Sequence, residues 1–327
     1  MALVYYYNMN NVKPLKIIII YGPTASGKSD VAIRLAKKFD GEIISADSRQ
    51  IFKGLDIGAG KVEKDEPGFI SRFFHKSKEN EFFSEGIRHH LIDVAEPMED
   101  YNVSHFKKDA ERIIEEISNR GKIPIICGGT NFWIDSIVHD SQIPEVAPNP
   151  QLRKELEEKT TEELFAQLEK MDSQRAENID AKNKVRLVRA IEITTKLGSV
   201  PELEFTTLNP NYDFLQIGIK TEREKINAKI KKRLDQRFED GMIIEVEELH
   251  ENEVSFEWME RIGLEYRWIS RYLQKKVEFE EMKEKLYFDI IHFAKRQMTW
   301  LKRNKEIIWL QDYSQIKKEV KKFLKKK

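Results

Sequence analysis

The fold follows from one stretch near the amino terminus, Lys16-Ile-Ile-Ile-Ile-Tyr-Gly-Pro-Thr-Ala-Ser-Gly-Lys-Ser29. Residues 17–21 are apolar at successive positions, so side chains on both faces of a strand would be apolar, which is typical of a parallel strand buried on both faces. Two glycines punctuate the next residues, and a helical pattern then continues to about Phe39. A strand that enters a helix through such a loop predicts an α/β protein with a parallel sheet.

The same alternation continues outward from this stretch. We expect further strands at residues 42–46, 91–94 and 123–127, and an amphipathic helix at 104–120 that Gly121 ends. Alternating strands and helices favour an open, doubly wound parallel sheet. Together with the Gly-x-x-x-x-Gly-Lys-Ser loop at 22–29, this alternation predicts a fold like that of the P-loop NTPases. The second half of the chain adds a helical insertion and carboxyl-terminal helices to this prediction.

The pattern changes after about His139, where three prolines mark a connection. We expect residues 1–140 to form the first part of a catalytic core. Residues 141–211 then form a helical insertion, and residues 212–327 complete the core with a strand at 212–220. Long helices are predicted at 221–240 and 281–303.

Composition narrows the functional classes. Of the 327 residues, 34% are charged and the formal net charge is zero, so a polyanionic partner would have to be held by local patches. The apolar run at 17–21 is far too short to cross a bilayer, and no signal peptide is recognisable. A single cysteine, Cys127, fits a reducing compartment. We expect a cytoplasmic, monomeric protein without membrane contact.

The loop after the first strand has the Walker A pattern, Gly-x-x-x-x-Gly-Lys-Ser, in its required context. Backbone N–H groups and the helix amino terminus would bind a diphosphate, Lys28 would contact a terminal phosphate, and Ser29 would bind Mg²⁺. The predicted diphosphate site comprises Gly22, Pro23, Thr24, Ala25, Ser26, Gly27, Lys28 and Ser29. A small-molecule or nucleotide kinase remains an alternative, although the strand at 123–127 ends in Gly-Gly-Thr130 and not in a Walker B acid.

Further blocks resemble one family. The stretch Ser45-Ala-Asp-Ser-Arg-Gln-Ile-Phe-Lys-Gly-Leu-Asp-Ile-Gly58 is similar to that of bacterial tRNA dimethylallyltransferases, also called tRNA isopentenyltransferases of the IPP transferase family. The likeness continues in the family's order through His90-Leu-Ile-Asp-Val94, Gly128-Gly-Thr130, Arg186-Leu-Val-Arg-Ala-Ile-Glu192 and Ala294-Lys-Arg-Gln-Met-Thr-Trp300. Adenylate isopentenyltransferases share the core, but the helical insertion favours the tRNA branch.

This resemblance implies transfer of a dimethylallyl group from dimethylallyl diphosphate to N6 of adenine 37 beside a tRNA anticodon. It implies that the loop binds the diphosphate, that Asp47 is the general base and that Arg233 neutralises the departing pyrophosphate, with Lys28 and Thr130 also catalytic. The anticodon stem-loop would be contacted by Asp47, Ser48, Arg49, Gln50 and Thr130, and from the insertion by Arg153, Val185, Arg186, Leu187, Val188 and Arg189.

The chemistry of the residues supports these roles independently. Cations and Mg²⁺ stabilise a leaving pyrophosphate, a carboxylate assists a weakly nucleophilic adenine amine, and the base must first leave its stack. The cations Lys225, Lys229, Arg233 and Arg237 recur every four residues and share one helix face, and Lys182, Arg186 and Arg189 share another. His89 and His90 are adjacent on a strand and point to opposite faces, so a shared metal ion is not expected.

The sequence departs from the family pattern at a few positions. Phe52 and Trp133 stand where tyrosines are usual, Leu264 replaces another tyrosine, and Ile290-Ile291 replaces a Thr-Arg pair. The last change removes a cation. A catalytically inactive RNA-binding protein is therefore a further alternative, although Lys28, Asp47, Thr130 and Arg233 are all retained.

Overall fold

The structure is a computed structural model that describes residues 13–66, 81–140, 143–202 and 207–326. The chain divides into two compact units, one made of Met1–Val138 with Asn209–Lys327 and the other of His139–Leu208. The boundaries expected from the sequence were 141 and 211, of which residue 141 lies outside the described residues. No helix in the described part of the chain is long and apolar enough to cross a membrane.

Within the described residues, the larger unit is built on a seven-stranded sheet with the order β3-β4-β2-β5-β1-β6-β7. Its strands are β1 (Leu15–Tyr21), β2 (Gly41–Ser45), β3 (Phe82–Ser84), β4 (Ile87–His90), β5 (Ile123–Cys127), β6 (Tyr212–Ile219) and β7 (Ile308–Leu310). All neighbouring pairs are parallel except β3 and β4. The predicted α/β class with a largely parallel sheet is confirmed.

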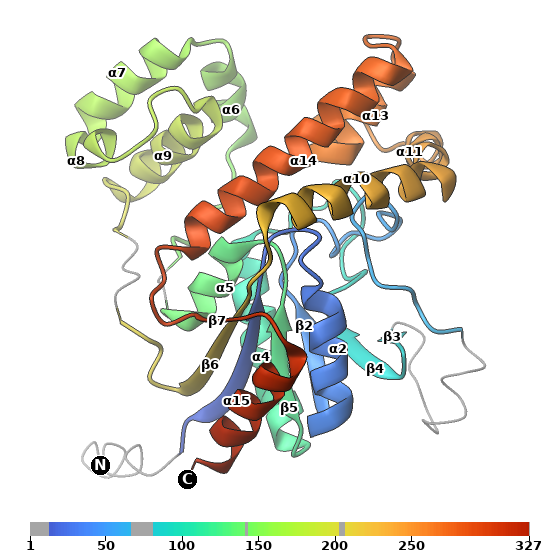
Figure 1. Ribbon diagram of the computed structural model, residues 1–327. Coiled ribbons are helices and arrows are strands. Elements are labelled where there is room, and N and C mark those ends of the chain that lie inside the picture. Colours follow the sequence, from blue (N-terminus) through green and yellow to red (C-terminus); the bar gives the residue numbers. More distant parts are fainter. Residues whose placement is uncertain (1–12, 67–80, 141–142, 203–206, 327) are drawn as a thin grey trace, which may run out of the picture. The chain divides into compact units, whose positions relative to one another are not determined.

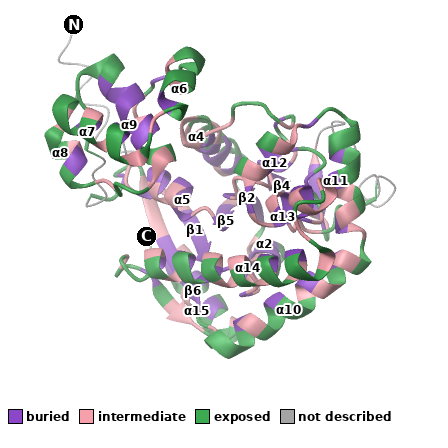
Figure 2. Ribbon diagram, turned by 90° about the horizontal axis from the view of Figure 1, so that it is seen from above, coloured by how far each residue is buried: buried purple, intermediate pink, exposed green. Residues whose placement is uncertain are grey.

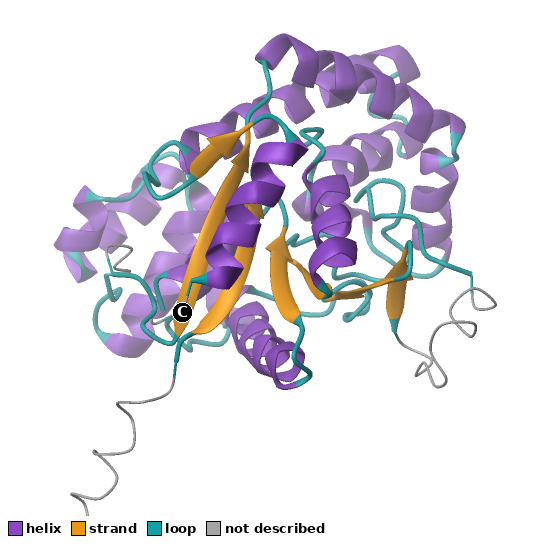
Figure 3. Cartoon of the chain, turned by 60° about the horizontal axis from the view of Figure 1, so that its bottom comes forward, coloured by secondary structure: helices purple, strands orange, loops and turns teal. Residues whose placement is uncertain are grey.

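Helices cover both faces of the sheet (Figure 3) because β1 and its neighbours are apolar on both sides. Ile18 and Ile20 pack with α2 (Lys28–Phe39) and α15 (Tyr313–Lys325), whereas Ile17 and Ile19 face the opposite cluster, which includes α4 (Val103–Asn119) and α5 (Asn131–Val138). In Figure 2 the buried segments of β1, β2 and β5 lie at the centre of this unit.

Five helices pack beyond the carboxyl ends of the strands, where ligands bind in open α/β sheets. They are α10 (Arg223–Glu239), α11 (Met242–Glu251), α12 (Phe256–Ile262), α13 (Leu264–Leu273) and α14 (Phe279–Leu301). In Figure 1, α10 and α14 cross above the ends of β1, β2 and β5. On α10 the side chains of Ile226, Ile230 and Leu234 are buried, and the face that carries Arg233 approaches the strand ends.

One predicted strand is wrong. Residues 91–94 do not extend, because Leu91 and Asp93 have φ angles of 59° and 56°, in the left-handed region. The strand instead precedes them as β4, and β3 pairs with it in the antiparallel sense. The short edge strands β3 and β7 were not anticipated, since three residues are too few to show a period.

The smaller unit consists of α6 (Pro150–Glu157), α7 (Thr161–Met171), α8 (Ser173–Glu177) and α9 (Lys184–Leu197) in its described part. Side-chain caps begin these helices: Asn149, Thr160, Asp172 and Asn183 each accept a backbone N–H bond of the first turn. The unit has a core of its own, to which Leu156, Leu164, Leu168, Leu187 and Ile191 contribute.

Candidate active site

The phosphate loop lies where the sequence placed it, between β1 and α2. Gly27 has a φ of 87°, a conformation that favours glycine, and Lys28 is the first residue of α2. A Cβ atom on Gly22 would lie 2.4 Å from Oγ of Ser26, so the loop is too tight for a larger residue there. Oγ of Ser26 is buried and has no hydrogen-bond partner among the described residues, as expected of a group that faces a ligand.

Two cations stand over this loop. Arg233, from α10, donates a hydrogen bond from Nη2 to Oγ1 of Thr24. Burial and the neighbouring charges of Arg237 and Arg49 lower the pKa of Arg233, and burial lowers the pKa of Lys28. Both positive charges are thus destabilised in the free protein, and an anion would relieve that cost.

A cavity of about 950 Å³ opens at the loop. Lys28, Ser29 and Arg233 line it, and further lysines come from residues 61, 64, 229 and 232. Asp30 and Ser29 supply oxygen ligands of the kind that Mg²⁺ prefers, and the described residues hold no cluster of three or more His, Cys, Asp or Glu side chains suited to a metal ion. These residues fit a Mg²⁺ ion held by few protein oxygens together with phosphate oxygens.

Asp47 follows β2 and is held beside Thr130, which follows β5. Oδ1 of Asp47 accepts a bond of 3.1 Å from the backbone N–H of Arg49, and Oγ1 of Thr130 accepts one of 3.0 Å from the backbone N–H of Ser48. A Cβ atom on Gly129 would lie 3.2 Å from Oδ2 of Asp47, and one on Gly128 only 2.1 Å from the carbonyl oxygen of Ala46. The two glycines therefore let the ends of β2 and β5 approach each other.

Gln297 of α14 joins the two halves of the site. Its Oε1 accepts from the backbone N–H of Thr24 at 2.8 Å, and its Nε2 donates to the carbonyl oxygen of Gly129 at 2.9 Å. The backbone carbonyl oxygen of Gln297 also accepts a hydrogen bond from the Asn131 side chain. The sequence carried a signal for this residue, because it lies in the block 294–300, but no role followed from it.

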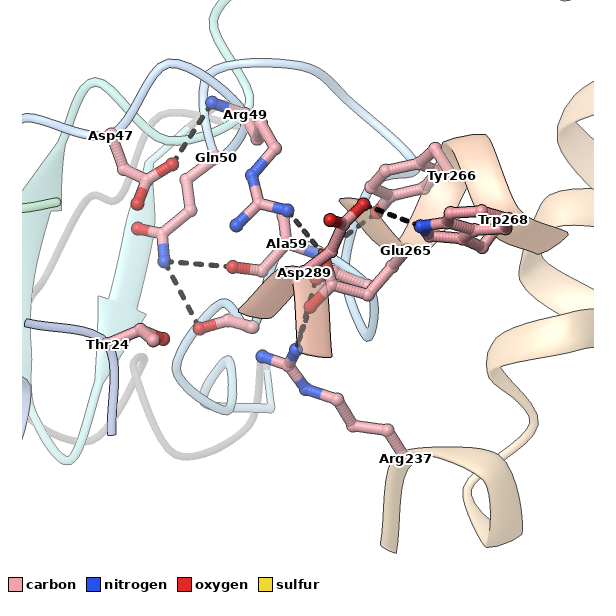
Figure 4. Close-up of polar contacts among 12 residues, drawn as sticks. Thr24, Asp47, Arg49, Gln50, Ala59, Arg237, Glu265, Tyr266, Trp268 and Asp289 are labelled. Atoms are coloured by element: carbon pink, nitrogen blue, oxygen red, sulfur yellow. Dashed lines mark hydrogen bonds and ion pairs between the residues drawn. The ribbon is translucent and has the colours of Figure 1, made fainter. Parts of the chain in front are cut away.

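The remaining members of the predicted nucleotide-contacting block have protein partners. Gln50 accepts from Oγ of Ser45 at 2.9 Å and donates from Nε2 to the carbonyl oxygen of Gly60 at 3.1 Å. Arg49 forms an ion pair of 2.5 Å with Glu265 of α13, and Glu265 also pairs with Arg237 at 2.8 Å (Figure 4). Nothing in the sequence around Glu265 distinguishes it from a surface glutamate, so its place in the site could not be predicted.

The residues predicted in the smaller unit differ in exposure. Val185 and Arg186 lie exposed in the first turn of α9, next to exposed Lys182, and the Val185 side chain is 79% exposed. Leu187 and Val188 face the core of the unit instead.

The other two arginines predicted to contact tRNA, Arg153 and Arg189, bind one buried carboxylate. Arg153 binds Glu192 through two bonds of 2.8 Å, and Arg189 lies 3.4 Å from the same carboxylate. Burial alone would raise the pKa of Glu192, but the bonds from Arg153, Asn149 and Arg189 lower it. Lys182, Val185 and Arg186 therefore offer the better exposed surface.

Comparison with known proteins identifies the family. The sequence model of the protein family described as IPP transferase matches residues 50–304 of this chain. The chain belongs to the IPP transferase family. The tRNA dimethylallyltransferase of Acetivibrio thermocellus is 38% identical over 301 residues, which span 90% of this chain and 91% of that protein.

Solved structures of the IPP transferase family agree with this assignment. A tRNA delta(2)-isopentenylpyrophosphate transferase from Staphylococcus epidermidis has a TM-score of 0.66 at 32% identity, covering 96% of this chain and all of that one. A eukaryotic dimethylallyltransferase acting on tRNA has a TM-score of 0.67 at 27% identity, covering 92% of this chain and 75% of that one.

The departures from the IPP transferase pattern lie in apolar surroundings. The Phe52 ring meets the Trp258 ring edge-on at 5.1 Å between centroids, and Trp133 stacks on Phe106 at 4.7 Å. Ile290 is buried, and Ile291 and Leu264 pack against the same core. These replacements extend the apolar core, and α14 places no charged group at positions 290 and 291.

Proposed function

We propose that this protein transfers the dimethylallyl group of dimethylallyl diphosphate to N6 of adenine 37 in tRNA, giving N6-isopentenyladenosine and pyrophosphate. One observation carries the proposal: Lys28, Arg233, Asp47 and Thr130, which come from four separate parts of the chain, meet at the carboxyl ends of β1, β2 and β5. Burial lowers the pKa of both Lys28 and Arg233, and the charge of Asp47 is close enough to oppose that lowering in each. Membership of the IPP transferase family supports the same reaction.

The charge balance of the site fits a diphosphate donor. Among the charged groups that interact at the strand ends, Lys28, Arg49, Arg233 and Arg237 carry four positive charges against the two negative charges of Asp47 and Glu265, an excess of two positive charges within this set. The phosphate loop would bind the diphosphate through backbone N–H groups at the start of α2. Ser29, with Asp30 nearby, would hold Mg²⁺, which when bound supplies a positive charge to the phosphate oxygens.

The residues of this chain then have separate roles in the transfer. The bond between C1 of the allyl group and the diphosphate oxygen breaks, and Lys28 and Arg233 stabilise the charge that develops on the leaving pyrophosphate. N6 of the adenine forms a bond to C1 and loses a proton to the Asp47 carboxylate. Thr130 fixes the backbone next to Asp47 through Ser48. The adenine has to leave its stack to reach these groups.

The anticodon arm would be held by both units. From the core, Asp47, Ser48, Arg49, Gln50 and Thr130 would contact the flipped nucleotide and its neighbours. From the smaller unit, Arg186 and Lys182 would bind phosphates, and Val185 would pack against the nucleic acid beside them. We propose that the protein acts as a monomer, in the cytoplasm where tRNA is modified.

The test uses labelled dimethylallyl diphosphate with an unmodified tRNA transcript, followed by digestion to nucleosides and mass spectrometry. N6-isopentenyladenosine should form with the transcript and should be absent when adenine 37 is replaced by guanine. Two further reactions separate the alternatives. Prenylation of free AMP would indicate an adenylate isopentenyltransferase, and ADP formation from ATP would indicate a kinase.

A further inference from the structure

A buried carboxylate next to the site bridges two arginines. Glu265, at the start of α13, is 2% exposed; its Oε2 lies 2.5 Å from Nη1 of Arg49, and its Oε1 lies 2.8 Å from Nη1 of Arg237. Burial alone would raise the pKa of Glu265, but Arg49 and Arg237 outweigh it and lower the pKa. The carboxylate is therefore charged, and both of its oxygens have a guanidinium partner.

Arg49 has two contacts of different kinds. Its backbone N–H donates to Oδ1 of Asp47, whereas its side chain turns toward Glu265 (Figure 4). Among the residues that the structure describes, Asp47 forms no ion pair, and the N–H of Arg49 is its one hydrogen-bond donor. The guanidinium closest in sequence to Asp47 is thus bound elsewhere.

Glu265 cannot easily move with Arg49, because hydrogen bonds hold α13 against the loop at residues 56–59. The Tyr266 hydroxyl accepts from the backbone N–H of Ala59 at 3.0 Å and donates to Oε1 of Glu245 at 2.9 Å. Glu245 in turn accepts backbone N–H bonds from residues 56, 57 and 58. A Cβ atom on Gly58 would lie 2.7 Å from the Tyr266 ring, so the loop and α13 are in close contact. Arg237, bonded also to the carbonyl oxygen of Gly58, holds the other oxygen of Glu265.

We propose that Glu265 is a positioning residue that holds the Arg49 guanidinium away from the Asp47 carboxylate and so leaves that carboxylate open to the acceptor amine. The inference rests on the proposed function, in which Asp47 is the base. Without Glu265, Arg49 would bind the nearest carboxylate, because arginine and carboxylate form strong, often bidentate, charge-assisted bonds. A carboxylate in such a pair binds a proton less well and is a poorer base.

The decisive comparison uses three variants: Glu265→Gln, Arg49→Met and the double variant. Glu265→Gln should lower kcat, at saturating tRNA and donor, by about 10- to 100-fold, somewhat less than the loss of a general base. The double variant should recover to within about threefold of Arg49→Met, because the competing guanidinium is gone. Arg49→Met is the reference because it and the double variant both lack the Arg49 guanidinium. Any loss of a tRNA contact would therefore change the KM for tRNA equally in these two variants.

A purely structural role of Glu265 predicts the opposite order. Removing one partner of a buried ion pair destabilises a protein, and the double variant would then be no more active than Glu265→Gln. A kcat of the double variant more than tenfold below that of Arg49→Met overturns the proposal, and this comparison holds even if Glu265→Gln alone does not fold. Thermal unfolding of each variant measures the loss of stability separately.

Glu260 provides a matched control on the neighbouring helix. Its carboxylate also pairs with two arginines, Arg267 at 3.3 Å and Arg271, and in the described residues no ion pair joins it to residues 47–60. Glu260→Gln should keep the wild-type kcat. A crystal structure of Glu265→Gln tests the inference without any assay: the Arg49 guanidinium should lie within 4 Å of the Asp47 carboxylate. An unmoved guanidinium contradicts the positioning role, whereas an inactive wild-type protein contradicts the proposed function alone.

Discussion

Asp47 and Arg233 differ in what holds each side chain at the site. Asp47 is fixed by a backbone N–H two residues ahead, so its place depends mainly on the turn that follows β2. Arg233 reaches the loop from α10 and contacts Thr24, more than 200 positions away in the sequence. The position of Asp47 is thus set by local geometry, whereas that of Arg233 is set by helix packing.

Replacement of Asp47 by asparagine should lower kcat by about 10²–10⁴-fold, because the amide cannot accept the N6 proton. Binding of tRNA should change little, since the side chain keeps its size and its bond to the N–H of Arg49. Single-turnover kinetics with a tRNA transcript would measure the loss. Turnover within threefold of the wild-type value would remove Asp47 from the mechanism.

Replacement of Arg233 by methionine should weaken catalysis but stabilise the free protein. Burial and the like charges of Arg237 and Arg49 make the Arg233 cation unfavourable before a donor binds. A gain of roughly 1 kcal/mol would raise Tm by about 2 °C in a chain of this size. Thermal unfolding with and without dimethylallyl diphosphate checks this, because the donor should raise the Tm of the wild type far more than that of the variant. A lower Tm for the free variant would contradict it.

At the scale of single elements, the two adjacent histidines of β4 have different surroundings. On β4, His89 pairs in register with Ile43 and His90 with Ile44, two residues that belong to different core clusters. His90 lies 2.7 Å from Glu42, whereas Nε2 of His89 has no hydrogen-bond partner among the described residues. The prediction that the two histidines face opposite sides of the strand agrees with this arrangement.

His89 should make the protein less stable in mild acid. Burial and then the nearby His90 lower its pKa from 6.5 to about 4, so the unfolded chain binds the proton first as the pH falls below 6.5. The stability that a neutral His89 provides is complete above pH 6.5 and is lost progressively down to about pH 4. The free energy of unfolding should be lower by about 1.4 kcal/mol at pH 5.5. Urea unfolding at pH 7.5 and 5.5 should show this loss in the wild type, and a smaller one in His89→Leu. The exposed His292→Gln is the control and should behave as the wild type.

The first turn of α9 should contribute to the salt dependence of tRNA binding. The double variant Lys182→Gln with Arg186→Gln should lose one to two phosphate contacts. The slope of the logarithm of the tRNA binding constant against the logarithm of the salt concentration should become less steep by about 0.7 for each contact with a single strand that is lost. The affinity for dimethylallyl diphosphate should stay unchanged. Lys170→Gln with Lys196→Gln, both exposed cations of the same unit, is the matched control and should leave the slope as it is. An unchanged slope in the first pair would show that this surface does not bind tRNA.

On the scale of the whole molecule, the insertion leaves and re-enters the core at one point. The backbone N–H of Asn209 donates to the carbonyl oxygen of Val138 at 2.7 Å, and its side chain donates to the carbonyl oxygen of Ile137. The two ends of the core segment are therefore adjacent, and a short connection can close the gap.

Deletion of residues 139–208 with a Gly-Gly bridge should give a folded core that binds dimethylallyl diphosphate but barely modifies tRNA. Lys28, Asp47, Thr130 and Arg233 all lie outside the deleted part. Calorimetry with the donor and the prenylation assay would measure the two properties. Loss of both together, in a protein that still shows a cooperative thermal transition, would mean that the donor site depends on the insertion.

The sequence by itself determined the parts that depend on neighbouring residues. The apolar run at 17–21 and the glycine spacing after it specify β1, the phosphate loop and the start of α2, because strand burial and left-handed turns depend on a few neighbouring positions. The ends of most long helices were predicted to within two residues for the same reason. The motif blocks at 45–58 and 128–130 likewise predicted the site residues that follow β2 and β5.

Only the tertiary structure decided which distant side chains complete the site. Gln297 meets the phosphate loop across 273 positions, and Glu265 meets Arg49 across 216. A sequence shows which face of a helix is apolar, but not which turn of that helix stands above a given loop, because that depends on how α10, α13 and α14 pack. Leu187 and Val188 illustrate the same limit: their place next to Arg186 is visible in the sequence, but their burial depends on the helices that pack around α9.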